Sequence, residues 1–399
     1  MHILFFQWNA FMQKGIETAF NRLNISYEKF FYIFSDWDYD DKFCKLFNDK
    51  LNSSPDIDVV FSVNFSPLIS DICNARGIIY ISWIYDAPLH IRKTVSLMNS
   101  VNRMYFFDRI QAEHYQKQGI LNVHHMPLAS DTYIFSDEGI NETINNRLSK
   151  KEPVFFNPTS IADNDYQCDV SFIGKLYKSD YAYLCTPLNQ YYRGYLEGIL
   201  NAQQNIYGAY LLDDLLTDTL LEELNSFYLK ASKGTFSVTK EELEFALACE
   251  ITSRERVTAL ALLQNRCHVN LYSGDKDERL THINQLGYVD YYTQMPKVFR
   301  NSKINLNISL KIIQSGIPLR ILDILASGGF LITNYQPELL EYFEPGIDLI
   351  IYEDIPDLIL KVQYYLANDD ERNIIAQNGY NKVSSLFNFD DKVRQLLSI

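Results

Sequence analysis

The sequence predicts an α/β protein built from doubly wound parallel sheets in two domains. Short and almost wholly apolar runs recur along the chain, and most are followed by a loop and a helical stretch, which is the repeating unit of such a sheet. The chain has 399 residues, more than one ordinary core holds. The pattern also stops in a polar stretch at 130–165 and restarts at 168, which separates two domains.

The first domain, expected at 1–165, opens with strand, loop and helix. Its predicted strands are 2–7, 27–34, 58–63, 78–83, 103–107 and 123–128, and its predicted helices are 15–23, 43–51, 68–76 and 110–118. Because strand and helix alternate, we expect the sheet to be parallel. The polar segment 130–165 reads as surface loops and linker.

The second domain, expected at 166–385, begins with the apolar strand 168–173. A long, Tyr- and Leu-rich segment at 177–265 carries no strand signal and is interpreted as a helical insertion. The sheet then resumes with predicted strands at 268–272, 287–291, 304–308, 330–333 and 349–352. Predicted helices lie at 292–300, 355–367 and 370–386, and a last helix is expected at 386–399.

Composition excludes several classes of partner. The formal net charge is −14, which argues against nucleic acid and against anionic lipid. The six cysteines form no CxxC pair, which is typical of reduced, packed thiols. The N-terminus lacks the features of a signal peptide, and no apolar run is long enough to cross a bilayer, so we expect a cytoplasmic protein with no integral membrane segment.

One stretch, SGIPLRILDILASGGFLITNY at 315–335, reads as a helix followed by a strand. Ser315 and Gly316 are expected to leave N–H groups free at the helix start, where a phosphate binds well. Arg320 would hold a second phosphate, and Asp323 would accept hydrogen bonds from ribose hydroxyls. The alternative is that Arg320 and Asp323 form an ordinary helix ion pair.

The segments SKINLNIS, SGIPLRILDILASGGFLITNY and YFEPGIDL, between 302 and 348, resemble the CgeB-like, spore maturation protein-like glycosyltransferases. WIYDAPLH and YFFDR resemble the N-terminal domain of that family, so the resemblance runs from about residue 78 to 383. It implies a GT-B fold, in which two Rossmann-like domains face each other across a cleft.

The resemblance also implies site residues. Many GT-B enzymes carry two acidic residues separated by seven others. The ribose-binding member of that pair is similar in placement to Asp323, while the other member falls on Ser315, which is not acidic. Lys311 is similar in placement to a diphosphate ligand, as are Gly174 and Lys175, although a Gly-Lys pair after a strand is often just a turn. The resemblance places the nucleobase of the donor near Tyr272.

These features predict a hexosyltransferase that moves a sugar from a nucleotide sugar, with a UDP-sugar favoured, to a protein side chain or surface glycan. No cofactor or metal is expected, because the pair Asp36 and Asp38 lies in an acidic turn. Asp86 is the candidate catalytic base, and His90 is the second choice. The alternative for Asp86 is a role in forming a turn, and the alternative for His90 is an ordinary surface position.

Two alternatives stay open at this stage. One is a non-catalytic protein that binds a nucleotide sugar or glycan with the same fold, and the other is a sugar-nucleotide epimerase.

Overall fold

The structure is a computed structural model that describes residues 1–150 and 166–398. The chain divides into two compact units. The first consists of Met1–Phe135, Ser315–Ala326 and Asn381–Ile399, and the second of Ser136–Gln314 and Ser327–Tyr380. The helix at 319–326 and the C-terminal helix therefore group with the N-terminal sheet, whereas the expected domains followed the chain without a break.

The first unit is built on a six-stranded sheet with the order β2-β1-β3-β4-β5-β6. All its neighbouring strands run parallel, as predicted. The strands are β1 (His2–Gln7), β2 (Ser26–Phe31), β3 (Val59–Val63), β4 (Ile79–Ile84), β5 (Asn102–Phe106) and β6 (Val123–His125). Every residue of β3 is buried, which is why a central parallel strand reads as a continuous apolar run.

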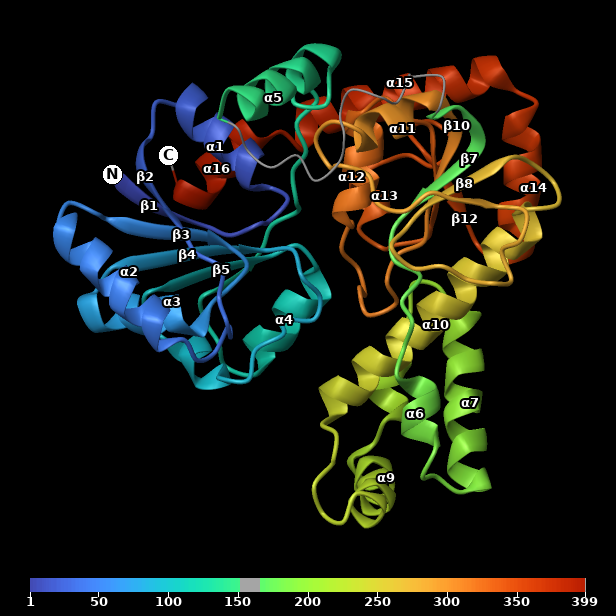
Figure 1. Ribbon diagram of the computed structural model, residues 1–399, viewed down its shortest axis with the longest axis horizontal. Coiled ribbons are helices and arrows are strands. Elements are labelled where there is room, and N and C mark those ends of the chain that lie inside the picture. Colours follow the sequence, from blue (N-terminus) through green and yellow to red (C-terminus); the bar gives the residue numbers. More distant parts are fainter. Residues whose placement is uncertain (151–165, 399) are drawn as a thin grey trace. The chain divides into compact units, whose positions relative to one another are not determined.

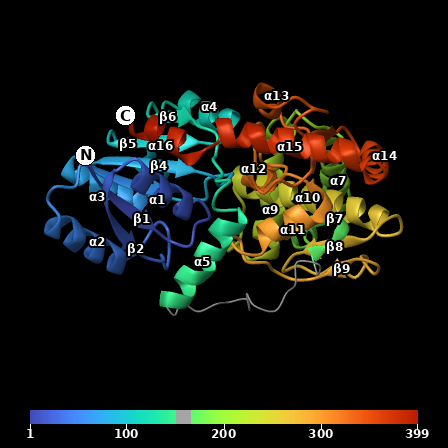
Figure 2. The same ribbon diagram turned by 90° about the horizontal axis from the view of Figure 1, so that it is seen from above.

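Helices cover both faces of this sheet. They are α1 (Gln13–Arg22), α2 (Asp41–Ser53), α3 (Pro67–Arg76), α4 (Arg109–Lys117) and α16 (Phe389–Leu397), with a 3₁₀ turn, η1 (Thr94–Met98). Helix α12 (Leu319–Ala326) is grouped with the same unit. Figure 1 shows α2 and α3 on one side of the sheet, with α1 and α16 on the other. The C-terminal helix α16 lies against α1 in both views (Figures 1 and 2), so the chain end is part of the first unit's core.

The second unit holds another six-stranded sheet, ordered β12-β11-β10-β7-β8-β9. Its strands also pair in parallel. They are β7 (Cys168–Ile173), β8 (Val269–Tyr272), β9 (Asn284–Gln285), β10 (Ser302–Asn307), β11 (Leu331–Asn334) and β12 (Ile350–Tyr352). The chain runs outward from β7 to β9 and then returns to build the other half from β10, so the order reverses between β7 and β10.

The predicted insertion at 177–265 is helical throughout its regular structure. It contains α6 (Tyr181–Cys185), α7 (Gln190–Gln204), α8 (Leu212–Leu215), α9 (Asp218–Ala231) and α10 (Lys240–Leu263). A capping box at Thr239 and Glu242 starts α10. Val257, Leu260 and Leu263, in the second half of α10, belong to the core under the sheet, so the insertion ends within this helix.

Other helices complete the second unit. They are α5 (Asp137–Lys150), α11 (Met295–Asn301), α13 (Leu339–Tyr342), α14 (Ile355–Leu366) and most of α15 (Asp369–Leu386). The interpretation of 130–165 as loops was wrong over α5, and the remainder at 151–165 lies outside the described residues. Arg147 of α5 donates to Asp290 and Asp137 accepts from Arg300, so distant ion pairs hold a helix whose own sequence is Asn-rich.

The strand predicted at 287–291 was also wrong. Gly287 has φ 77°, a conformation that ends an extended segment, and the edge strand is β9, just before it.

Among the helices of the described residues, none is both long and apolar enough to cross a membrane.

Candidate functional site

The reversal of strand order in the second sheet creates a place where two loops leave neighbouring strands in opposite directions. Ligands of open α/β sheets bind at such a point, beyond the carboxyl ends of the strands. Here the loop after β7 begins with Gly174 and Lys175, and the segment after β10 runs from Ile308 to Lys311. The structure therefore brings three of the predicted ligands, Gly174, Lys175 and Lys311, to the ends of adjacent strands.

Arg256 of α10 joins these two strand ends. Its Nη1 donates to the carbonyl of Lys175 at 2.5 Å, its Nε donates to the carbonyl of Ile308 at 3.1 Å, and its Nη2 donates to the same Ile308 oxygen. The guanidinium carbon lies 5.2 Å from the ring centre of Phe172 and 4.8 Å from that of Tyr177. A buried positive charge therefore lies at the switch point of the sheet.

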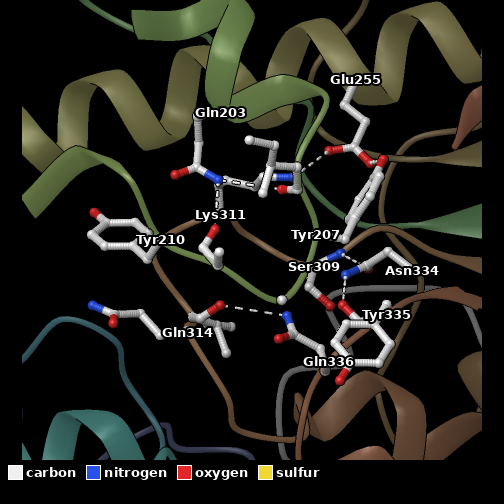
Figure 3. A pocket seen from close by; sticks show the side chains of 14 residues that line it. Gln203, Tyr207, Tyr210, Glu255, Ser309, Lys311, Gln314, Asn334, Tyr335 and Gln336 are labelled. Atoms are coloured by element: carbon white, nitrogen blue, oxygen red, sulfur yellow. Dashed lines mark hydrogen bonds and ion pairs between the residues drawn. The ribbon is translucent and has the colours of Figure 1, made fainter. Parts of the chain in front are cut away.

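Two more α10 side chains contact the segment after β10. The Thr252 hydroxyl accepts the backbone N–H of Lys311 at 2.9 Å, and Glu255 faces the Lys311 ammonium across 3.7 Å (Figure 3). Thr252, Glu255 and Arg256 are spaced by three and four residues, so they share one helix face. This face positions the loop that carries Lys311.

Glu255 and Arg256 had no role predicted from the sequence, because both fell within a presumed insertion. The sequence contains a pattern from which this face could have been found. Thr252, Glu255 and Arg256 form a polar face on a helix that is otherwise apolar toward its C-terminus. All three side chains are buried, so the negative charge of Glu255 and the positive charge of Arg256 need partners elsewhere in the fold.

The remaining predicted contacts of the second unit lie in different surroundings. Lys175 is exposed, as a contact to a charged ligand requires, and a Cβ at Gly174 would meet neighbours only at 3.5 Å, an ordinary contact. Tyr272 is 4% exposed and packs with Tyr166 and Val298. Burial raises the pKa of Tyr272 well above its usual value, and its role beside a nucleobase stays a prediction.

The segment predicted to open a helix at Ser315 lies in the first unit and begins its helix later, at Leu319. That part of the prediction was wrong, because the residue before Pro318 is disfavoured from helical geometry. Ser315 instead binds Asp108, with its hydroxyl donating to Oδ1 at 2.9 Å and its N–H donating to Oδ2 at 3.1 Å.

Gly316 is required by packing at this place. A Cβ there would lie 2.9 Å from the Asp108 Cα and 2.9 Å from the Phe107 ring. Asp323, on α12, is 1% exposed and accepts a hydrogen bond from the Ser130 hydroxyl at 3.2 Å. Arg320 is half-buried on the same helix, and the nucleotide roles of Arg320 and Asp323 stay predictions.

Asp86 follows β4 in the first unit, as predicted for the candidate base. The Asn64 amide donates to Asp86 Oδ2 at 2.6 Å, and Asn64 Oδ1 accepts the N–H of Tyr85 at 3.0 Å. Asn64 itself follows β3 with φ 62°, so one side chain ties the ends of two adjacent strands. His90 is exposed a few residues further on.

The acidic turn at Asp36 and Asp38 is occupied by Arg92. The Arg92 guanidinium pairs with both carboxylates, and buried Asp38 also accepts the N–H groups of Arg92 and Lys93. Hydrogen bonding to Arg92 lowers the pKa of Asp36. This turn therefore fastens a loop of the first unit.

A family model matches the C-terminal part of the chain, which contributes to both units. Residues 252–398 match a family model described as glycosyl transferase-like, and the match begins at Thr252, on the helix face described above. No curated protein matches the chain.

Solved structures resemble the whole chain. Sucrose-phosphate synthase from Thermosynechococcus elongatus aligns with a TM-score of 0.54 at 10% identity, covering 100% of this chain and 98% of that one. Anabaena HepE in complex with UDP-glucose aligns with a TM-score of 0.53 at 10% identity and the same coverage. These likenesses confirm the predicted fold, two doubly wound α/β sheets of the GT-B type.

Proposed function

We propose that the protein is a glycosyltransferase that uses a nucleotide-sugar donor, whose diphosphate binds at the switch point of the second sheet. The observation that carries this is the bridge of Arg256 to the carbonyls of Lys175 and Ile308. It holds a buried positive charge between the two loops, and Lys175, whose carbonyl it binds, is exposed. A leaving diphosphate is stabilised by fixed charge of this kind.

The comparisons support the class of reaction and favour a UDP-sugar. The glycosyl transferase-like match spans Arg256, Lys311 and Asp323, and the HepE structure contains UDP-glucose. We further propose that the chain is CgeB-like, that its donor is a hexosyl nucleotide, and that it acts without metal, since lysine and arginine can supply the charge at the diphosphate. The proposed acceptor is a protein side chain or a surface glycan.

Transfer requires removal of a proton from the acceptor. In the proposed reaction the acceptor hydroxyl gives its proton to Asp86, its oxygen bonds to the anomeric carbon, and the bond from that carbon to the diphosphate oxygen breaks. The Asn64 amide fixes Asp86 by its 2.6 Å bond to Oδ2. His90 is the second candidate for the base.

Asp86→Asn should abolish transfer and leave nucleotide affinity unchanged, since an amide cannot accept the proton. Release of nucleoside diphosphate in the presence of an acceptor measures the first effect, and calorimetry measures the second. His90→Asn is the matched variant. Full activity in Asp86→Asn would remove Asp86 from the reaction and leave His90, or a retaining mechanism, in its place.

A non-catalytic binding protein is the second candidate, and one observation favours it. Ser315 occupies the place of an acidic residue in many GT-B enzymes, and its hydroxyl and N–H are both engaged by Asp108. Nucleotide-sugar turnover separates the two functions: a binding protein would retain the intact donor under all acceptor conditions.

A further inference from the structure

A group of metal-ligating side chains lies at the amino-terminal edge of the first sheet. His2 opens β1, Glu28 lies on β2, and Asp56 lies in the loop before β3. The three strands run parallel, and His2 is in register with Ser26, so the segments begin side by side near the chain start (Figure 1). One ligand atom from each of the three side chains lies within 4.8 Å of the other two. Folding therefore gathers an imidazole and two carboxylates that are far apart in the sequence.

His2 presents one ring nitrogen to this group and uses the other. Its Nε2 lies 3.2 Å from Glu28 Oε1, and its Nδ1 lies 2.7 Å from the Ser26 hydroxyl. A metal-binding histidine usually donates its second ring N–H to an oxygen, which fixes the tautomer and the orientation of the ring. The Ser26 hydroxyl can accept that N–H, which leaves Nε2 as the ligand atom. The backbone N–H of His2 also donates to Asp58 Oδ2 at 2.8 Å, so the residue itself is held in place.

Glu28 is held by the oxygen that faces away from His2. Its Oε2 accepts hydrogen bonds from the Lys50 ammonium and the Ser54 hydroxyl, while Oε1 faces the His2 ring. Hydrogen bonding to Lys50 lowers the pKa of Glu28 to about 2. The carboxylate is therefore ionised at neutral pH, as a metal ligand must be, and its outer oxygen has the hydrogen-bond support that ligating carboxylates commonly have.

The spacing and the charge of this group suit zinc. Zinc binds histidine nitrogen and carboxylate oxygen at about 2.0–2.2 Å, so neighbouring ligands of a tetrahedral site lie roughly 3.4 Å apart. The Nε2–Oε1 distance of 3.2 Å already fits, and Asp56 is exposed, so a rotation of its side chain can close the remaining gap. Three carboxylates, counting Asp58, surround the ring against two cations, Lys50 and the amino group of Met1. The local charge is therefore negative before an ion binds.

We propose that His2, Glu28 and Asp56 bind a zinc ion, with water completing a four-coordinate site. The ion joins β1, the edge strand β2 and the loop before β3, and so fastens the edge of the first sheet. Asp86, the candidate base, follows β4 at the opposite, carboxyl edge of the same sheet. The zinc is therefore a structural ion that takes no part in the proposed transfer, and this inference does not depend on the proposed function.

Calorimetric titration of metal-free protein with Zn²⁺ at neutral pH tests the site, with Mg²⁺ as the comparison because magnesium prefers oxygen ligands alone. The wild type should bind zinc saturably and should not bind Mg²⁺ there. His2→Asn should weaken zinc binding by more than about tenfold, since loss of even a ligand's hydrogen-bond partner costs that much. His268→Asn is the matched control, because His268 is an exposed histidine of the second unit, beside Asn284, and should bind zinc as the wild type does.

A second pair of variants keeps the test decisive if His2→Asn fails to fold. Asp56→Asn removes a ligand from an exposed loop and should weaken zinc binding without changing the melting temperature of the metal-free protein. Asp49→Asn, on the exposed face of α2, removes the same charge outside the site and should leave zinc binding unchanged. Spectra of the Co²⁺-loaded wild type should lack thiolate-to-metal absorption, which distinguishes this site from one made by the free cysteines.

Zinc should also raise the melting temperature of the wild type and slow hydrogen exchange at the β2 amides, because an ion that binds only the folded state stabilises it. Both effects should be lost in His2→Asn. Absence of saturable zinc binding in the folded wild type overturns the proposal, as does wild-type affinity in both His2→Asn and Asp56→Asn. An equal loss in Asp56→Asn and Asp49→Asn overturns it too, since that result shows only a general effect of charge. In each of these cases His2 is an ordinary histidine hydrogen-bonded to its neighbours on β2.

Discussion

At the scale of single residues, the second unit depends on buried charges with few but well-placed partners. Arg256 uses its guanidinium on main-chain carbonyls of two loops. Lys311 and Glu255 face each other without a hydrogen bond. Such groups are costly to bury, and each makes a definite prediction about stability or binding.

Arg256→Met should destabilise the protein by about 2–3 kcal/mol, because two buried carbonyls lose charge-assisted hydrogen bonds. Denaturant unfolding measures the change. Arg279→Met is the matched control, since Arg279 is exposed and pairs with neighbouring Asp277, an interaction worth under about 1 kcal/mol. A similar loss in both variants would show that Arg256 does not fasten the switch point.

Glu244 on α10 predicts a pH dependence. Burial and the nearby charge of Asp213 raise the pKa of Glu244 to about 7, and its Oε1 is buried with no hydrogen-bond partner among the described residues. A carboxyl with a raised folded pKa binds its proton more tightly when folded. Its contribution to stability is present below the unfolded pKa of about 4.3 and is lost as the pH rises through 7.

Glu244→Gln should therefore gain stability relative to the wild type between pH 5 and pH 8. The expected gain is of the order of 1 kcal/mol, because partial exposure screens the charge. Thermal unfolding across this pH range measures it, and Glu241→Gln, exposed on the same helix, should leave the wild-type pH profile unchanged. A wild type whose stability relative to Glu244→Gln does not fall with pH would contradict the assignment.

At the scale of elements, two helices have roles that their places in the sequence hide. Helix α10 begins in the insertion and ends in the core of the second sheet, so it carries both structural and site residues. Helix α16 closes the chain against α1, where Arg22 binds Asp390 and Asp131. The contact between α1 and α16 is close enough to need glycine, since a Cβ at Gly15 would overlap the Phe389 ring.

Gly15→Ala should destabilise the first unit by about 1–3 kcal/mol, because the packed Phe389 ring must shift. Gly194→Ala in α7 is the matched helical control, where nothing lies within 4 Å, and should stabilise by about 0.5–1 kcal/mol through helix propensity. Thermal unfolding of both variants measures the pair. Stabilisation by alanine at both sites would show that α16 does not pack tightly on α1.

At the scale of the whole molecule, the parallel sheets were predictable because central strands such as β1, β3 and β4 are buried almost throughout. A central strand such as β3 is buried on both faces, so it can be recognised as a continuous apolar run without an alternating pattern. Long-range contacts account for the errors. Helix α5 is held by ion pairs to Asp290 and Arg300, and Ser315 binds Asp108, which lies 207 residues away.

Long-range contacts also separate the candidate-site residues that the sequence predicts from those that it does not. Lys175 and Lys311 were expected as ligands from the family resemblance, and their place at the edge of the sheet could be predicted because each follows an apolar strand. Arg256 and Glu255 could not be assigned partners, because their contacts are carbonyls and hydroxyls brought close only by folding. Sequence patterns thus located the edge of the second sheet. The structure added the face of α10 that completes the candidate site.

A thermal-shift panel of UDP, GDP, dTDP and CMP with their sugar conjugates, with and without Mg²⁺, tests the central claim most directly. A ligand at about 100 times its dissociation constant adds nearly 3 kcal/mol of stability. We expect a clear shift with one nucleotide series, independent of Mg²⁺, in the wild type and a much smaller one in Lys175→Ala. No shift with any nucleotide, or an equal shift in Lys175→Ala, would contradict a nucleotide-sugar site at the switch point of the second sheet.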